Sequence, residues 1–159
     1  IPFRDEKGDV FAAQGRALGE EQPKYLTVKF EDRPKIFGLD RADFTQTIYV
    51  VEGPIDSLFL DNAIAVAGSD MLQVVNQYAK DNLVMVLDNE RRSQETIKKM
   101  EHLIDNDYQI CIWPDTNPHK DVNDMILAGM TSKEIQSTIK ENIFTGLSAR
   151  VRLADWKRI

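Results

Sequence analysis

Four short apolar segments, each followed by a stretch with helical spacing, constrain the fold of this chain most strongly. The segments are rich in β-branched residues and end at a polar residue, a glycine or a proline, as buried strands do. Strands that alternate with helices form parallel sheets covered on both faces. The predicted class is therefore α/β, with a central, mostly parallel four-stranded sheet and helices on both faces. The predicted strands are residues 47–51, 63–67, 83–87 and 109–113, and the predicted helices are residues 54–61, 71–78, 93–106 and 121–128.

The two ends of the chain differ from this alternating middle. Residues 1–41 contain short β-like pieces at 10–13 and 25–30, and they predict a small mixed α+β subdomain before the sheet. Near the other end, Thr131-Ser-Lys-Glu134 is a capping box that opens a further helix. We therefore expect three parts, residues 1–43, 44–130 and 131–159.

Charge and cysteine content exclude several classes of protein. The net charge is −6, and the acidic side chains are concentrated in the alternating middle. Such a chain does not coat nucleic acid by its overall charge. The single cysteine, Cys111, excludes an intramolecular disulfide framework and a zinc site built from several cysteines. The apolar runs are far shorter than the roughly 20 residues of a membrane span.

The start of the chain and its cysteine usage together predict where the protein works. The sequence begins at Ile1 without Met and without a secretory signal peptide. We expect a piece of a longer protein in a reducing, cytoplasmic compartment, with no membrane as partner.

Acidic residues follow three of the four predicted strands. Glu52 comes directly after the first strand, Asp88 ends the third, and Asp121 lies beyond the fourth. Because the carboxyl ends of parallel strands meet at one edge of a sheet, we expect these side chains to lie close together. They would repel one another unless cations lie between them, and carboxylate oxygens suit Mg²⁺ or Mn²⁺. The further acids at this edge are Asp56, Glu90, Asp115 and Asp124.

Each acid has a simpler explanation when it is taken alone. Loops at strand ends are polar, and Asp often caps the helix that follows. Asp121 and Asp124 flank a predicted helix start, so capping and dipole roles stay open for both. The joint placement at three strand ends favours a metal site.

Three of these acidic segments together resemble the Toprim domain. Residues 48–60 resemble its first motif, a hydrophobic strand followed by Glu-Gly and, three residues further on, Asp. Residues 88–90 stand where that family has its Asp-x-Asp motif, and residues 120–124 resemble the late Lys-Asp-x-Asp segment of primases. Toprim domains share an acidic Mg²⁺ site and occur in primases, topoisomerases, some nucleases and a recombination protein.

The amino-terminal part narrows the resemblance to bacterial-type, DnaG-like DNA primases of a diverged or phage type. Residues 1–10, 15–19, 23–26 and 37–39 match, in order and spacing, the basic subdomain that precedes Toprim in these primases, and residues 67–69 resemble the stretch after the second Toprim strand. The chain departs from the family pattern with Glu90 in place of the second Asp of Asp-x-Asp, with Asn123 in the late motif, and with Arg91-Arg92.

The resemblance implies the catalytic core of a DNA primase, which synthesises short RNA primers on single-stranded DNA by metal-dependent nucleotidyl transfer during replication. It implies Mg²⁺ or Mn²⁺ as cofactor, and single-stranded DNA and ribonucleoside triphosphates as partners. A replicative helicase would contact a part of the protein outside this chain, in a bacterium or a phage-infected host. The resemblance also implies that residues 1–43 form the basic subdomain, residues 44–130 the Toprim domain and residues 131–159 a helical, basic extension.

The same resemblance assigns roles to ten residues. Glu52 is either a metal ligand or the acceptor of the hydroxyl proton. A metal-dependent Toprim nuclease and a non-catalytic nucleic-acid-binding Toprim module remain open as alternatives. The implied roles are catalysis for Glu52, Asp56, Asp88 and Glu90, metal binding for Glu52, Asp88, Glu90 and Asp121, and template or nucleotide binding for Arg16, Lys24, Gly68, Ser69 and Lys120.

Overall fold

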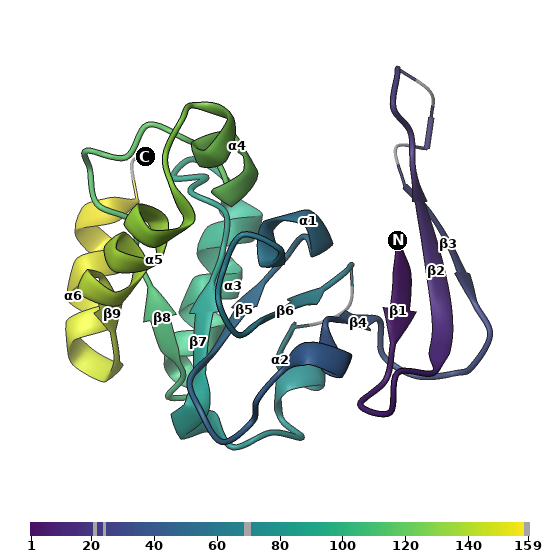
Figure 1. The fold of residues 1–159 in the computed structure, drawn as a ribbon. Helices are drawn as coiled ribbons and strands as arrows, with labels where there is room; N and C mark the ends of the chain where they lie inside the picture. The colour runs from purple at the N-terminus through teal and green to yellow at the C-terminus, as the bar shows by residue number, and fades with distance from the viewer. Residues whose placement is uncertain (21, 24, 69–70, 158–159) are drawn as a thin grey trace.

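The computed structural model describes residues 1–159 except residues 21, 24, 69–70 and 158–159. A six-stranded sheet forms the body of the protein, and a three-stranded sheet stands beside it (Figure 1). The strand order is β4-β6-β5-β7-β8-β9 in the larger sheet and β1-β2-β3 in the smaller one. No helix in the described part of the chain has the length and apolar character needed to span a bilayer.

Four parallel strands form the middle of the larger sheet, and each lies where the sequence predicts a strand. These strands are β5 (Ile48–Val51), β6 (Ala63–Val66), β7 (Leu83–Val86) and β8 (Gln109–Cys111). The α/β class is thus confirmed. Antiparallel edge strands β4 (Ile36–Phe37) and β9 (Ile143–Phe144) extend the sheet to six strands. Neither edge strand is predictable from the sequence, because a strand of two residues shows no periodicity.

Side chains of the parallel strands alternate between two hydrophobic cores, one on each face of the sheet. In β5, Ile48 and Val50 belong to the first core, and Tyr49 and Val51 belong to the second. Because both faces are covered, every residue of β5, β6 and β7 is buried. The first core contains residues of α2 (Met71–Val75), α3 (Gln94–Asp105) and α6 (Gly146–Trp156), and the second contains residues of α4 (Val122–Leu127) and α5 (Ser132–Glu141).

Three helices begin at caps that the sequence contains. The side chains of Ser93, Asp121 and Thr131 accept hydrogen bonds from backbone amides in the first turns of α3, α4 and α5. The capping box of α5, which Thr131 forms with Glu134, is complete. Caps are local in sequence, so these helix starts agree with the prediction.

Helix α1 (Pro54–Ser57) is shorter than the predicted residues 54–61. Arg41 explains where it ends, because its guanidinium donates to the carbonyl oxygen of Ser57 at 3.2 Å, to its hydroxyl at 2.7 Å and to the carbonyl oxygen of Ala63 at 3.2 Å. The carbonyl oxygen of Ser57, at the end of the helix, thus accepts a hydrogen bond from Arg41 and not from the next turn of a longer helix. Helix α2 also ends early, at Val75 instead of residue 78.

The amino-terminal part forms an antiparallel sheet of β1 (Pro2–Arg4), β2 (Val10–Arg16) and β3 (Tyr25–Lys29). The predicted mixture of helix and strand is wrong here, because the described residues before β5 contain strands and a single 3₁₀ turn, η1 (Leu39–Arg41). Phe3 and Phe11 pack with Ala67, which follows β6. This small core joins the two sheets, and β4 enters the larger sheet directly.

Helix α6 covers one end of the first core and reaches the loop after β7. Trp156 is buried in that core, and its indole Nε1 donates to Asn89 Oδ1 at 3.2 Å. Asn89 lies between Asp88 and Glu90, so the carboxyl-terminal helix supports the loop that carries two of the predicted site residues. The division of the chain at residues 43 and 130 stays a prediction.

We expect Trp156→Ala to lower the free energy of unfolding by about 3–5 kcal/mol, the usual cost of truncating a buried aromatic side chain. Trp156→Phe keeps most of the packing and should cost less, because it mainly loses the bond to Asn89. Urea denaturation measures both. The exposed Leu147 on the same helix provides the control, since Leu147→Ala should change stability by less than about 0.5 kcal/mol. Equal losses in Trp156→Ala and Leu147→Ala would contradict this account of α6.

Candidate active site

A cleft of about 490 Å³ lies between the smaller sheet and the carboxyl ends of the parallel strands. We call it the strand-end cleft. One wall comes from β2 and β3, which contribute Gln14, Arg16, Tyr25 and Thr27, and the other comes from the loops after β5, β6, β7 and β8. Its lining on the strand-end side includes Glu52, Gly53, Asp56, Gly68, Asp88, Lys120, Asp121 and Asn123.

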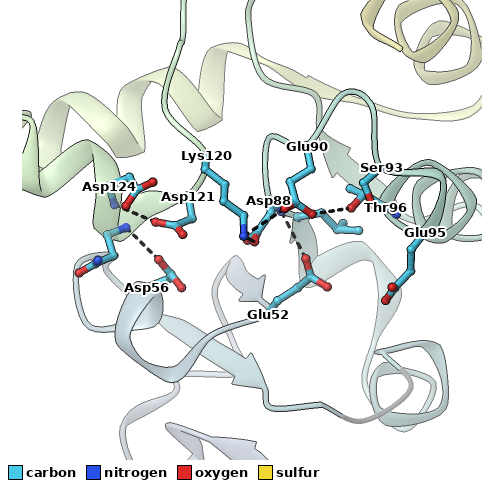
Figure 2. A network of polar contacts seen from close by, with 12 residues as sticks. Glu52, Asp56, Asp88, Glu90, Ser93, Glu95, Thr96, Lys120, Asp121 and Asp124 are labelled. Carbon is cyan, nitrogen blue, oxygen red and sulfur yellow. Dashed lines mark hydrogen bonds and ion pairs between the residues drawn. The ribbon is translucent and has the colours of Figure 1, made fainter. Parts of the chain in front are cut away.

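Four of the five predicted site acids meet in this cleft. Glu52 follows β5, Asp56 lies in α1, Asp88 follows β7, and Asp121 is the N-cap of α4 (Figure 2). Residues far apart in sequence are brought together because parallel strands end at the same edge. Glu90 does not line the strand-end cleft and instead accepts a hydrogen bond from Thr96 Oγ1 at 3.2 Å.

The carboxylate of Asp56 lies close to the backbone of Gly53, three residues earlier in the first motif. A Cβ atom at Gly53 would overlap Asp56 Oδ2, so the glycine leaves room for this carboxylate. Asp56 Oδ1 also accepts a hydrogen bond from the backbone amide of Asn123 at 2.8 Å, which ties α1 to the start of α4. The capping alternative for Asp121 is confirmed as well, because it accepts from the amide of Asp124 while it lines the cleft.

Burial and mutual repulsion make two of these acids hard to ionise. Burial, followed by the negative charge of Glu52, raises the pKa of Asp88 to about 7, and Lys120 acts in the opposite direction. Burial also raises the pKa of Asp56, although the Asn123 amide opposes the shift and Asp121 adds to it. The strand-end cleft therefore concentrates negative charge that a bound cation would relieve.

Two lysines contact these acids from opposite sides. Lys120 Nζ lies 3.0 Å from Glu90 Oε1 and 3.7 Å from Asp88 Oδ2. Lys99 Nζ lies 2.8 Å from Glu52 Oε1. Lys120 lines the strand-end cleft, whereas Lys99 lines a second cavity.

The second cavity, of about 400 Å³, lies on the other side of Glu52 between α2 and α3. Glu52 and Gly68 line both hollows. Apolar side chains of Val66, Met71, Leu72 and Leu103 form part of its lining, together with Glu95, Lys98, Lys99 and His102 from α3.

The chemistry of the acids suits a divalent metal, although their present arrangement does not yet form a metal centre. Hard carboxylate oxygens are the ligands of Mg²⁺ and Mn²⁺. Within the described ranges, no group of three or more His, Cys, Asp or Glu side chains is arranged to hold an ion. Lys120 lies where it neutralises Asp88 and Glu90, so a metal ion would compete with this ammonium group.

The loop after β7 is held in place by Asn89, which sequence reasoning treated only as the middle position of a motif. Its side-chain amide donates to the carbonyl oxygens of Asn117 at 3.0 Å and His119 at 2.9 Å, and its backbone amide donates to the carbonyl of Lys120. Asn89 thereby fastens the Asp88 loop to the loop that carries Lys120. Its partners lie about thirty positions away, so no local pattern in the sequence could identify it.

The predicted binding residues are placed as follows. Arg16, Gly68 and Lys120 line the strand-end cleft, and Lys24 and Ser69 lie outside the described residues. Lys35 also lines the cleft, and its Nζ would lie 3.6 Å from a Cβ atom placed at Gly68. Arg33 and Lys35 are two further cations that the amino-terminal sequence offers for holding the template, and of these two Lys35 lines the cleft while Arg33 does not.

No family model matches the chain. Over its whole length it is 42% identical to the DNA primase of Enterobacteria phage T4, of which it covers 47%. The chain thus spans about half the length of this curated relative.

Solved structures of primases share the fold. The zinc-binding and RNA polymerase domains of the Aquifex aeolicus primase match 91% of the chain and 40% of their own, with a TM-score of 0.67 and 21% identity. A DnaG primase catalytic domain bound to single-stranded DNA matches 98% of the chain and 53% of its own, with a TM-score of 0.65 and 20% identity. The chain is therefore similar in sequence to a phage DNA primase, and it shares the fold of primase domains. The relationship covers both walls of the strand-end cleft, because the T4 primase aligns with the entire chain.

The raised pKa of Asp88 makes the stability of the protein depend on pH. Since the folded state holds this proton up to about pH 7 and the unfolded state releases it near pH 4, wild-type stability falls as pH rises between these values. We expect Asp88→Asn to melt roughly 3–8 °C above the wild type at pH 8, for a relief of about 1–2 kcal/mol. The difference should shrink toward pH 4, where wild-type Asp88 is also neutral.

Thermal melts across pH 4–8 measure this effect. Asp124→Asn is the matched control, because Asp124 is an exposed acid on α4 that does not line the strand-end cleft. A difference between Asp88→Asn and the wild type that stays constant across this pH range would contradict the assignment.

Proposed function

We propose that this chain is the catalytic core of a DNA primase, which joins ribonucleotides into short primers on a single-stranded DNA template. The observation that carries the proposal is the strand-end cleft, which four acids line together with Arg16 of the smaller sheet and Lys35, just before β4. Nucleotidyl transfer needs phosphate oxygens neutralised and a 3′-hydroxyl deprotonated, and this cleft contains groups for both tasks.

The acids of the strand-end cleft are proposed to hold Mg²⁺ or Mn²⁺. Glu52, Asp88 and Asp121 are the proposed ligands, and Glu90 joins them if Lys120 moves away from it. When bound there, the metal ion neutralises the phosphate oxygens and polarises the α-phosphate for attack.

The protein's own residues bind and orient the substrates. Glu52 stays in two possible roles, as a ligand or as the acceptor of the attacking hydroxyl's proton. Asp56 supports the site as a neighbouring acid held by the Asn123 amide. Arg16 and Lys120, together with Lys35, are proposed to bind template or triphosphate, since Arg forms paired bonds with phosphate and Lys acts as a point charge.

The alternatives are favoured less. A Toprim nuclease would use similar metals, but nothing in that reaction calls for a second wall built from β2 and β3. A binding module without activity has no need of acids crowded enough to raise the pKa of Asp88.

We further propose that residues 44–130 form a Toprim domain that follows an amino-terminal basic subdomain. A replicative helicase is proposed to contact a part of the protein outside this chain.

We expect Glu52→Gln to lower primer synthesis at least about a hundredfold, because the amide keeps the shape and loses the charge that the reaction uses. The assay supplies a single-stranded template, ribonucleoside triphosphates and Mg²⁺ or Mn²⁺, with a chelator as blank. Asp61→Asn removes an exposed acid outside the strand-end cleft and should leave the rate unchanged. Shortened template would identify a nuclease, and the absence of any product would identify a binding module.

We expect template binding to be weak and sensitive to salt, since it depends on a few local cations and not on the overall charge of −6. Two to four phosphate contacts predict a slope of log affinity against log salt of roughly −1.5 to −3 for a single strand. Arg16→Gln and Lys35→Gln should each flatten the slope by about 0.7. Titration of a fluorescent oligonucleotide over a salt series measures it.

Lys29→Gln provides the control for this series, because Lys29 lies on β3 outside the strand-end cleft and pairs with Asp32. If it flattens the slope as much as Arg16→Gln does, the cleft is not where the template binds.

A further inference from the structure

Lys99 contacts the first acid of the site, and nothing in the family motifs points to it. Helix α3 places it there, because the buried stripe of Ile97, Met100 and Leu103 fixes the helix against the sheet. Glu95 and Lys99 lie one turn apart on an adjoining face of the helix, and Lys99 contacts Glu52, the residue directly after β5. Lys99 Nζ lies 2.8 Å from Glu52 Oε1 and 2.9 Å from Glu95 Oε1.

The two carboxylate oxygens of Glu52 are held by different partners. Lys99 binds Oε1, and the backbone amide of Asp88 donates to Oε2 at 3.4 Å. The second bond is long and therefore weak. Lys99 is thus the stronger of the two anchors, and its ammonium group neutralises the Glu52 carboxylate that it contacts.

Lys99 reaches Glu52 from the side opposite to the substrates. It lines the second cavity between α2 and α3, and it does not line the strand-end cleft, in which the substrates are proposed to bind. With 26% of its side chain exposed, Glu52 is accessible from the cleft while Lys99 holds it from behind.

We propose that Lys99 is a positioning residue for primer synthesis, which holds the Glu52 carboxylate in a fixed place at the strand-end cleft. The inference rests on the proposed function. It does not depend on whether Glu52 serves as ligand or as proton acceptor, since both roles need a fixed carboxylate. Lys99 acts only through Glu52, and a misplaced catalytic group costs rate rather than substrate affinity.

The test compares Lys99→Met, Lys99→Arg and Lys98→Met in steady-state primer synthesis. Lys99→Met should lower kcat about tenfold or more while KM for the nucleotide stays within about twofold. Lys99→Arg should restore kcat to within about threefold of the wild type, because the guanidinium can also bind a carboxylate. Lys98, an exposed neighbour that lines the same cavity, is the matched control, and its variant should behave as the wild type does.

Three outcomes would overturn the proposal. The first is a wild-type kcat in Lys99→Met, and the second is a rise in KM alone, which would place Lys99 on the triphosphate. The third is an equal loss of rate in Lys98→Met. Melting temperatures of all variants establish that they are folded.

A second measurement does not need activity and separates this proposal from the proposed function. A double-mutant cycle of Lys99→Met and Glu52→Gln in urea unfolding should be non-additive, because the two side chains share one contact. Additive effects would overturn the positioning role even if the wild type makes primers. If the wild type makes no primers, the proposed function is wrong, and Lys99 then has no effect on catalysis to explain. Non-additivity in the unfolding cycle would still show that Lys99 and Glu52 are in contact.

Discussion

Repulsion among carboxylates at one edge of the sheet is the constraint on which the site depends. Four acids converge there because β5, β7 and β8, which precede them in the chain, are parallel and end at the same edge. The protein tolerates them by two means, the protonation that burial favours at Asp88 and the ammonium groups of Lys120 and Lys99. An arrangement that stores like charge in this way is suited to a cation or to a substrate that brings one.

The rest of the fold keeps these side chains from moving apart. Both faces of the sheet are covered, so the strands that precede Glu52 and Asp88 are buried and packed on both sides. The loops beyond them are fastened by contacts that span the chain, above all through Asn89, which reaches from Trp156 in α6 to the loop before Lys120. The carboxyl-terminal helix thus supports the site although it lines no part of the strand-end cleft.

The smaller sheet supplies the opposite charge. Arg16 comes from β2, and Lys35 lies just before β4, so the basic wall is attached to the larger sheet through an edge strand and the small core around Phe3. Arg33, a neighbouring cation, does not contribute, because it pairs with Asp5, Glu6 and Glu31. The wall therefore depends on which cations the small sheet directs inward and not on its net charge.

The sequence by itself determined the four parallel strands, the capped starts of α3, α4 and α5, and the acids that follow the strands, because these depend on periodicity and on partners a few residues away. Only the tertiary structure decided that Glu90 faces Thr96 and Lys120 while Asp56 joins the strand-end cleft. It alone also decided that Asn89 and Lys99 belong to the site's surroundings, and that Lys35 rather than Arg33 lines the cleft. These roles depend on contacts between residues roughly thirty to fifty positions apart, and no local pattern encodes such contacts. The edge strands β4 and β9 likewise depend on pairing with β6 and β8, and the end of α1 contacts Arg41, so these features also involve partners outside their own segments.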